Sequence, residues 1–400
     1  MDPTTRALLA VIASNKGDHV AAEAHTTAAR RDARGAARRE RQIVEIAALV
    51  MAGGSDRADG LALEHSAEFP DDTTLLARIT HPAHPSQEPA QGRPEGAAMT
   101  NEPYDVVVVG GGAAGLSAAL VLGRARRRVA VVDAGAPRNA PAAHMQGYLS
   151  RDGMPPAELL AAGRAEVTAY GVEVVPDQVL TIEPGFVVLL ASGQALQARR
   201  VLVTTGASDE LPDIPGVRDR WGRDLLHCPY CHGWEVRDQP LGVLGSHPAA
   251  VQHAQLVRQW SDDVVFFVHT YDLTAAELVE LDARGVQVVP GAVARLVVTD
   301  DRLTGVELAD GTLVERTAVF IRPNIAPHPD GLLSGLGCTF DQAGFVAVDG
   351  TGATSVRGVW AAGNAADPRA QVITAAGAGS AAAIAINADL VQEDVERALR

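Results

Sequence analysis

The chain has 400 residues, enough for two or three domains with substantial hydrophobic cores. Hydrophobic residues make up 47% and charged residues 21%, a composition typical of soluble globular proteins. The formal net charge of −15 argues against nucleic acid as a partner, because binding to phosphates requires a basic surface.

The sequence also speaks against membrane insertion and secretion. No apolar run reaches the roughly 18 residues of a membrane span, and the longest uncharged stretch, residues 370–388, is rich in Ala and Gly. The N-terminus lacks the pattern of a secretory signal peptide. Three cysteines are too few for a disulfide framework, which fits a reducing compartment. We therefore expect a cytoplasmic protein with no membrane partner.

The first part of the chain predicts three helices. They cover about residues 18–33, begun by an aspartate cap, residues 36–52, ended by two glycines, and residues 56–69, ended before a proline. Residues 17–29 and 54–67 are similar to each other at a separation of about 37 residues, near the period of helical-hairpin repeats. This segment resembles a piece of a tetratricopeptide-repeat protein.

We interpret residues 1–80 as a helical appendage with no role in the chemistry, and its arginines between Arg30 and Arg41 as a solvated helix face. Residues 81–103 are rich in Pro, Gly and polar residues and predict a flexible linker. Met99 precedes the first clear strand, so the catalytic unit could begin there. A gene fusion and a misplaced start both remain open explanations of the upstream segment.

From Tyr104 the pattern becomes that of an α/β protein. A buried strand over residues 104–109, an amphipathic helix over 113–127 and a strand over 128–134 form a βαβ unit. A second unit follows, with a strand at 240–245, a helix at 249–260 and a strand at 263–269. Alternating residues over 286–321 predict a β-meander, and the chain ends with a strand at 358–363 and a helix over 380–395.

The first βαβ unit carries a glycine fingerprint at Gly110, Gly112 and Gly115. The first glycine permits a tight turn, the second lets a pyrophosphate approach the backbone, and the third lets helix and strand pack closely. The helix N-terminus supplies free N–H groups to phosphates. Asp133 ends the second strand, where a carboxylate accepts hydrogen bonds from a ribose. These features together predict a dinucleotide site.

At this point the chain resembles a known family. The segments that carry the likeness are, in order, "GGGAAG", "VVDAGAPRN", "TTGASDELPDIPG", "CPYC" and "GVWAAGNAADPRAQVITAAGAGSAAA". Together they resemble the low-molecular-weight thioredoxin reductases, which are FAD-dependent pyridine nucleotide–disulfide oxidoreductases of class II. The resemblance extends from Tyr104 to about Ala398. It implies an α/β fold of two Rossmann-like, three-layer ββα domains, the second inserted in the first, and a homodimer.

The resemblance also implies domain boundaries and FAD contacts. The FAD domain would comprise residues 104–215 and 323–400, and the nicotinamide-type domain residues 216–322. The family usually has Asp where this chain has Asn364, whose amide can still form hydrogen bonds. The residues that would contact FAD are Gly110, Gly112, Ala113, Ala114, Gly115, Asp133, Ala134, Arg138, Asn139, Thr205, Gly206, Gly363, Asn364, Gln371, Val372 and Thr374, the last three of these along the isoalloxazine edge.

The second glycine fingerprint is altered. Gly245 keeps the first position, but His247 stands where the second glycine belongs, and its Cβ would block a pyrophosphate. Pro248 removes one N–H from the helix start. Thr270 and Tyr271 replace the two arginines with which the family holds the 2′-phosphate of NADPH. We therefore expect NADPH to bind poorly or not at all.

Cys228 and Cys231 form a C-x-x-C pair that admits three interpretations. Zinc needs four ligands, and Cys338 has no second cysteine or histidine nearby. Two inert core cysteines would sit on an apolar face, which the flanking His, Pro and Gly do not form. The favoured interpretation is a redox dithiol without a metal. His232 follows the pair and could move protons near neutral pH.

By resemblance, Cys231 would react with the flavin and Cys228 with the substrate, while His232 takes the place of the family's usual Asp. The form "CPYCHG" is similar to a branch that includes dithiol oxidases of natural-product pathways and reductases that use a carrier other than NADPH, such as a ferredoxin-like protein. We expect a thiol–disulfide oxidoreductase acting on a thioredoxin-like protein or a small dithiol or disulfide. An oxygen-using dithiol oxidase and a non-catalytic flavin scaffold are the alternatives.

Overall fold

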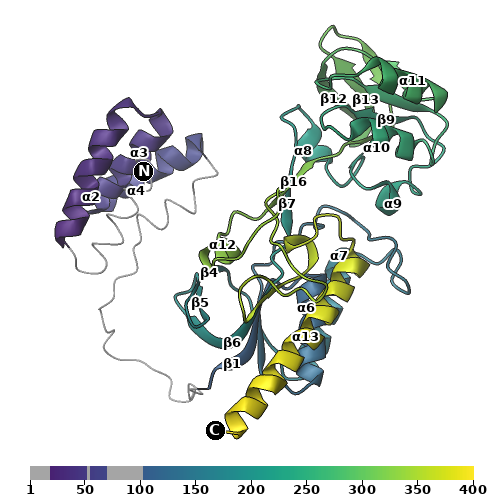
Figure 1. Cartoon of the computed structure of the whole chain (residues 1–400). Helices are drawn as coiled ribbons and strands as arrows, with labels where there is room; N and C mark the ends of the chain where they lie inside the picture. Colours follow the sequence, from purple (N-terminus) through teal and green to yellow (C-terminus); the bar gives the residue numbers. More distant parts are fainter. Residues whose placement is uncertain (1–18, 52–54, 70–101) are drawn as a thin grey trace. The chain divides into compact units, whose positions relative to one another are not determined.

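The structure is a computed structural model that describes residues 19–51, 55–69 and 102–400 (Figure 1). The chain divides into two compact units, residues 1–99 and residues 100–400. The predicted aspartate cap and most of the predicted linker lie outside the described residues.

The described part of the first unit is helical, as the sequence predicts. It consists of α2 (His19–Asp32), η1 (Ala33–Gly35), α3 (Arg38–Met51) and α4 (Ser55–Glu68). Ile43 and Ile46 of α3 are almost completely buried against Ala29 of α2. His65 of α4 is also buried, with its Nδ1 atom 3.0 Å from Oε1 of Gln42. These contacts tie the three helices into one small core.

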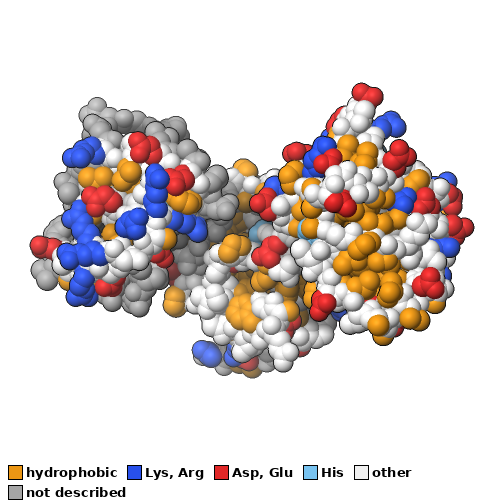
Figure 2. Space-filling model, turned by 90° about the horizontal axis from the view of Figure 1, so that it is seen from above, with side chains coloured by type: hydrophobic (Ala, Val, Ile, Leu, Met, Phe, Trp, Pro, Cys, Tyr) orange, Lys and Arg blue, Asp and Glu red, His pale blue; other side chains and the backbone are white. Residues whose placement is uncertain are grey.

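The arginines of this unit lie on its surface. Figure 2 shows blue side chains gathered over the described residues of the unit. Arg30 is paired with Glu45 at 3.3 Å, and Arg38 with Glu68 at 3.1 Å. The expected solvated helix face is confirmed for the residues that carry it.

The second unit contains two larger sheets, one mainly parallel and one wholly parallel, besides two small antiparallel sheets. In the first, the strand order is β3-β2-β1-β6-β5-β4, with β17 paired to β6. Strands β1, β2, β3, β6 and β17 are parallel, while β4 and β5 extend the sheet with antiparallel pairs. The bounds are β1 (Tyr104–Val109), β2 (Val129–Val132), β3 (Glu173–Val175), β4 (Val179–Glu183), β5 (Val187–Leu190), β6 (Ala195–Val203) and β17 (Val359–Ala361).

Three helices accompany this sheet, namely α6 (Ala113–Arg124), α7 (Pro156–Ala169) and α13 (Val372–Ala398). A Cβ atom on Gly379 would lie 2.0 Å from the carbonyl oxygen of Ala114, so glycine allows α13 to pack directly on α6. Two predicted boundaries are wrong: α6 ends at Arg124, before residue 127, and α13 begins at Val372, well before residue 380. Gly379 is therefore a packing residue, although glycine has low helix propensity, whereas a Cβ on Gly377 would meet no atom within 4 Å.

Helix α13 also corrects an expectation about apolar runs. By length and composition it could cross a membrane, unlike any other helix in the described part of the chain. Of its most apolar stretch of 18 residues, 28% is buried in the protein. Core helices of soluble proteins can be equally long and apolar. Its contact with α6 shows that here it belongs to the sheet domain.

The second sheet has the order β11-β10-β9-β15-β8, with all pairs parallel. Its elements are β8 (Leu225–Leu226), β9 (Leu241–Leu244), α10 (Ala250–Val257), β10 (Val264–Phe267), α11 (Ala275–Ala283), β11 (Gln287–Val289) and β15 (Ala318–Phe320). The β-meander is shorter than predicted and consists of β12 (Val293–Thr299), β13 (Arg302–Leu308) and β14 (Leu313–Glu315). Strands β11 and β15 instead join the parallel sheet: β15 is fully buried in its interior, whereas β11 forms a partly exposed edge.

Two antiparallel strands connect the two sheet domains. The chain leaves the first domain through β7 (Ala207–Glu210) and returns through β16 (Asn324–Pro327), which pair with each other (Figure 1). The second domain is therefore inserted in the first, as predicted. Short elements complete the unit: α8 (Val217–Arg220), α9 (Pro229–His232), α12 (Leu332–Gly335) and η3 (Gly363–Ala365).

Candidate functional site

The glycine loop after β1 has the shape that the fingerprint predicts. Gly110 has φ of 105°, and a Cβ there would lie 2.5 Å from the carbonyl oxygen of Thr204. A Cβ on Gly115 would lie 1.9 Å from the carbonyl oxygen of Gly110, so this glycine allows α6 to start directly behind the loop. A Cβ on Gly112 would meet no protein atom within 4 Å. Gly112 therefore faces open space, where a pyrophosphate can approach the backbone.

The second glycine of the "GGG" run has a separate role that the fingerprint does not specify. A Cβ on Gly111 would lie 2.6 Å from the carboxylate of Asp133. Asp133 stands just after β2 and accepts a hydrogen bond from the backbone N–H of Gly135 at 3.3 Å. Gly111 thus leaves room for the predicted ribose carboxylate beside the loop.

The remaining predicted cofactor residues meet at the same edge of the sheet. Thr204 follows β6, and its buried hydroxyl lies 2.8 Å from the carbonyl oxygen of Gly110. Thr205 and Gly206 come next, at the same end of the strand. Gly363 follows β17 and has a φ of 68°. A Cβ at this position would lie 3.0 Å from the Cβ of Ala114, which is a tight contact. Since these strands are parallel, their carboxyl ends lie at one edge of the sheet, where dinucleotides bind in folds of this kind, and the residues there fit FAD.

Arg138 and Asn364 are bound to protein groups at this edge. Arg138 forms a bidentate ion pair with Asp209 of β7, with Nε and Oδ2 2.8 Å apart. Its Nη1 also donates to Oδ1 of Asn364 at 3.3 Å. The amide nitrogen of Asn364 donates to the carbonyl oxygens of Asp367 and Ala370 at 2.9 and 3.0 Å. Ala134 and Asn139 lie on the loop after β2 that carries Arg138.

The two cysteines form a disulfide at the start of α9. Cys228 is the N-cap residue and Cys231 lies within the helix, with the Cα atoms 5.2 Å apart. The backbone N–H groups of Cys231 and His232 both donate to the carbonyl oxygen of Cys228. A Cβ on Gly233 would lie 2.8 Å from the ring of Trp260, so glycine lets α9 rest on this side chain. This arrangement is that of a redox pair in its oxidised form.

Cys338 takes no part in this pair. Its side chain is buried, and its Sγ lies 3.5 Å from Oγ1 of Thr354. Burial raises the pKa of its thiol. A buried thiol of this kind is a poor nucleophile and behaves as a small apolar residue.

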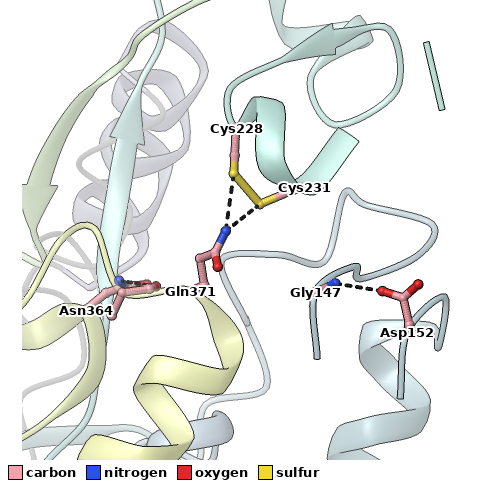
Figure 3. The surroundings of a disulfide bond; sticks show 7 residues. Gly147, Asp152, Cys228, Cys231, Asn364 and Gln371 are labelled. Carbon is pink, nitrogen blue, oxygen red and sulfur yellow. Dashed lines mark hydrogen bonds between the residues drawn. A yellow bond between two sulfur atoms is a disulfide. The ribbon is translucent and has the colours of Figure 1, made fainter. Parts of the chain in front are cut away.

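Gln371 links the disulfide to the edge of the first sheet where the predicted FAD residues lie. It is the N-cap residue of α13, and its Nε2 lies 3.7 Å from Sγ of Cys228 and 3.6 Å from Sγ of Cys231 (Figure 3). Val372 and Thr374 follow in the first turn of α13. The inserted domain therefore presents its disulfide to the first domain at the residues predicted to line the isoalloxazine.

Two histidines, His227 and His232, flank the dithiol in the sequence, and burial favours their neutral form. Burial lowers the pKa of His232, against the opposing effect of Glu235. Burial also lowers the pKa of His227 to about 4, with Asp209 opposing this shift. A neutral imidazole can accept a proton from a thiol, which is the role predicted for His232.

The second nucleotide loop is filled by its own residues. Gly245 still allows the tight turn, because a Cβ there would lie 2.5 Å from the carbonyl oxygen of Val268. The ring nitrogen Nδ1 of His247 accepts the N–H of Ala249 at 3.0 Å, and the N–H of Ala250 donates to the carbonyl oxygen of His247. Pro248 has no N–H. Positions 248 to 250, which lead into α10, therefore offer no free backbone N–H donor.

Tyr271 closes the same loop from the other side. Its hydroxyl oxygen lies 2.6 Å from Oε1 of Glu277 and 3.2 Å from the carbonyl oxygen of Pro248, and its single O–H can donate to either. Its Cβ lies 2.9 Å from the position of a Cβ on Gly245, and its ring packs edge-on against Phe266. A pyrophosphate would need both this space and the missing donors, so the residues present do not fit NADPH.

The fold and the site define a disulfide oxidoreductase with two dinucleotide-type domains. The family model described as pyridine nucleotide–disulphide oxidoreductase matches residues 104–380. The chain belongs to this family, and it is a thiol–disulfide oxidoreductase of the thioredoxin reductase type.

Individual relatives agree with this assignment. Thioredoxin reductase sirT of Leptosphaeria maculans is 31% identical over 314 residues, covering 73% of this chain and 96% of that protein. A probable thioredoxin reductase of Arthroderma benhamiae is 33% identical over 191 residues, covering 45% of this chain and 47% of the relative, so the match spans about half of that protein. The crystal structure of HlmI is 60% identical with a TM-score of 0.73, covering 74% of this chain and 96% of that chain.

Proposed function

We propose that the protein is a FAD-dependent dithiol oxidase that closes a substrate dithiol to a disulfide without using NADPH. The observation that carries this proposal is the second nucleotide loop. Tyr271 fills the space beside Gly245, and His247 takes an N–H that a phosphate would need. If a nicotinamide does not supply the electrons, a thiol substrate is the donor that the chemistry of the dithiol favours.

The residues at the disulfide support the following sequence. A substrate thiolate attacks Sγ of Cys228, forms a mixed disulfide and releases Cys231 as a thiolate. The second substrate thiol, deprotonated by neutral His232, attacks the substrate sulfur of the mixed disulfide. The product disulfide leaves, and Cys228 and Cys231 are left reduced. FAD, when bound, would supply two-electron redox chemistry between the reduced cysteines and oxygen, so that the Cys228–Cys231 disulfide re-forms and oxygen is reduced to hydrogen peroxide.

The residues that would hold FAD are those at the carboxyl edge of the first sheet. Gly110, Gly112 and Gly115 leave the pyrophosphate path open, and Asp133 would accept hydrogen bonds from the adenosine ribose. Gln371 and the first turn of α13 would lie along the flavin ring. The N-terminus of this 27-residue helix would also place the positive end of the helix dipole near the flavin ring.

We further propose a homodimer located in the cytoplasm, with either a small dithiol or a thioredoxin-like protein as substrate. An apolar stripe supports the dimer. On α13, Ile384 is 63% exposed, and Val391 and Val395 are each 48% exposed. These residues recur at helical spacing along one face, which a second copy of the chain would cover.

Anaerobic stopped-flow spectroscopy of the FAD-loaded protein tests the electron source. We expect dithiothreitol to bleach the flavin absorbance and oxygen to restore it, with one hydrogen peroxide formed per dithiol. NADPH at micromolar concentration should leave the flavin oxidised. Rapid bleaching by NADPH would contradict the proposal, and so would a Cys228→Ser variant that oxidises the dithiol at the unchanged rate.

A further inference from the structure

Gln371 contacts both reacting sulfur atoms. Its Nε2 lies 3.7 Å from Sγ of Cys228 and 3.6 Å from Sγ of Cys231, and Figure 3 shows the amide pointing at the disulfide from the start of α13. A side-chain amide has two N–H donors, so it can serve two sulfur atoms at once. In the described part of the chain, no other side chain donates a hydrogen bond to either sulfur.

The position of this amide is held by its own loop. Asn364 donates to the carbonyl oxygens of Asp367 and Ala370, and Ala370 is the residue before Gln371. Arg138 in turn donates to Oδ1 of Asn364 at 3.3 Å. An aspartate at position 364 could not donate to the two carbonyl oxygens. The amide of Asn364 thus fixes the turn from which Gln371 reaches the sulfurs.

The contact has a different strength in the two redox states. A disulfide sulfur is a weak acceptor, whereas a thiolate is charged and attracts a donor strongly. The neighbouring histidines do not supply a charge at neutral pH, because burial lowers the pKa of His232 and of His227. An amide donor does not titrate, so its contribution persists over the whole working range of pH.

We propose that Gln371 is a catalytic residue whose amide stabilises the thiolate released at Cys231, and afterwards the thiolate released at Cys228. When the substrate sulfur bonds to Cys228, the Cys228–Cys231 bond breaks and its electron pair stays on Cys231, next to the amide. When the product leaves, the electron pair of the mixed disulfide stays on Cys228, which the second N–H can reach. This inference rests on the proposed exchange at the dithiol, but it concerns the ionisation of the sulfurs and not the identity of the electron acceptor.

The test measures the thiol pKa of each cysteine separately. Full-length, FAD-loaded Cys228→Ser and Cys231→Ser proteins each retain one of the two site thiols, and mass spectrometry distinguishes it from buried Cys338. The pH dependence of alkylation by iodoacetamide gives the thiol pKa in each background, alone and combined with Gln371→Leu. We expect Gln371→Leu to raise both pKa values by about one pH unit, which slows alkylation at pH 7 about tenfold. Gln371→Glu should raise them further, because a carboxylate adds negative charge.

Gln392 on the same helix offers a matched control. It is exposed, its Nε2 bonds to Glu396 at 3.3 Å, and Gln392→Leu should leave both thiol pKa values unchanged. The side chain of Gln371 makes no capping hydrogen bond at the start of α13, so its loss should not unfold the helix. If Gln371→Leu loses FAD, Gln371→Met provides a second side chain without a donor. Thiol pKa values within about 0.3 of the parent proteins would overturn the inference, whatever the electron acceptor proves to be.

Discussion

Replacing Arg138 by methionine should destabilise the protein by about 3 kcal/mol at pH 7, because it leaves Asp209 charged and without its partner. The side chain of Asp209 is 9% exposed and that of Arg138 is 22% exposed, so solvent compensates little for the lost pair. The two side chains share a bidentate contact, with Nε and Oδ2 2.8 Å apart. Removing one partner of a buried pair costs about 3–5 kcal/mol, and the partial exposure of Arg138 places this case at the lower end.

The assay is equilibrium unfolding of the full-length, FAD-loaded protein in guanidinium chloride, followed by circular dichroism. The double variant Arg138→Met/Asp209→Leu is the matched control, since it removes both charges and should recover most of the lost stability. A second measurement follows the imidazole of His227 by NMR. Burial lowers the pKa of His227, the charge of Asp209 opposes this shift and the charge of Arg138 adds to it, so Arg138→Met should raise the pKa.

Two results would refute this reasoning. A loss of less than about 1 kcal/mol in Arg138→Met would mean that the pair contributes no more than a surface ion pair. An equally large loss in the double variant would mean that the shape of the side chains, and not the charge of Asp209, determines the effect.

Three further predictions concern other parts of the site. Burial lowers the pKa of His253 to about 3, so the stability that its neutral form contributes above pH 6.5 is lost as the pH falls toward 3. His253→Phe should therefore reduce the difference in unfolding free energy between pH 7 and pH 5 by about 2 kcal/mol, and an unchanged difference would contradict this. Asn364→Asp loses two donated hydrogen bonds and should lower stability by about 2 kcal/mol in thermal unfolding; a rise in melting temperature would speak against the turn described. Gly111→Ala places a Cβ 2.6 Å from the carboxylate of Asp133 and should weaken FAD binding about tenfold in fluorescence titration, whereas Gly335→Ala, which meets no atom within 4 Å, should not.

The local elements of the fold could be predicted from the sequence. Strand β1 has the predicted bounds, because a mainly apolar run of six residues that ends in a glycine turn leaves few alternatives, and five of the six are buried. The start of α13 could not be predicted, since glycines at 377 and 379 are typical of a loop, and only the packing of Gly379 on Ala114 of α6 explains the glycine at 379. The meander was predicted too long because a short alternating strand is similar in sequence whether it joins an antiparallel or a parallel sheet.

The chemistry of the short motifs follows directly from the sequence. The glycine fingerprint, the C-x-x-C pair and the altered second loop each depend on residues close together in the chain, where backbone conformation follows from residue type. Which distant groups come into contact is known only from the tertiary structure. Gln371 reaches a sulfur 140 residues away, Arg138 reaches Asp209 across 71 residues, and Tyr271 covers the loop that begins at Gly245. Such contacts depend on how the insertion, the parallel strands and α13 are placed in space, and no local pattern in the sequence specifies that placement.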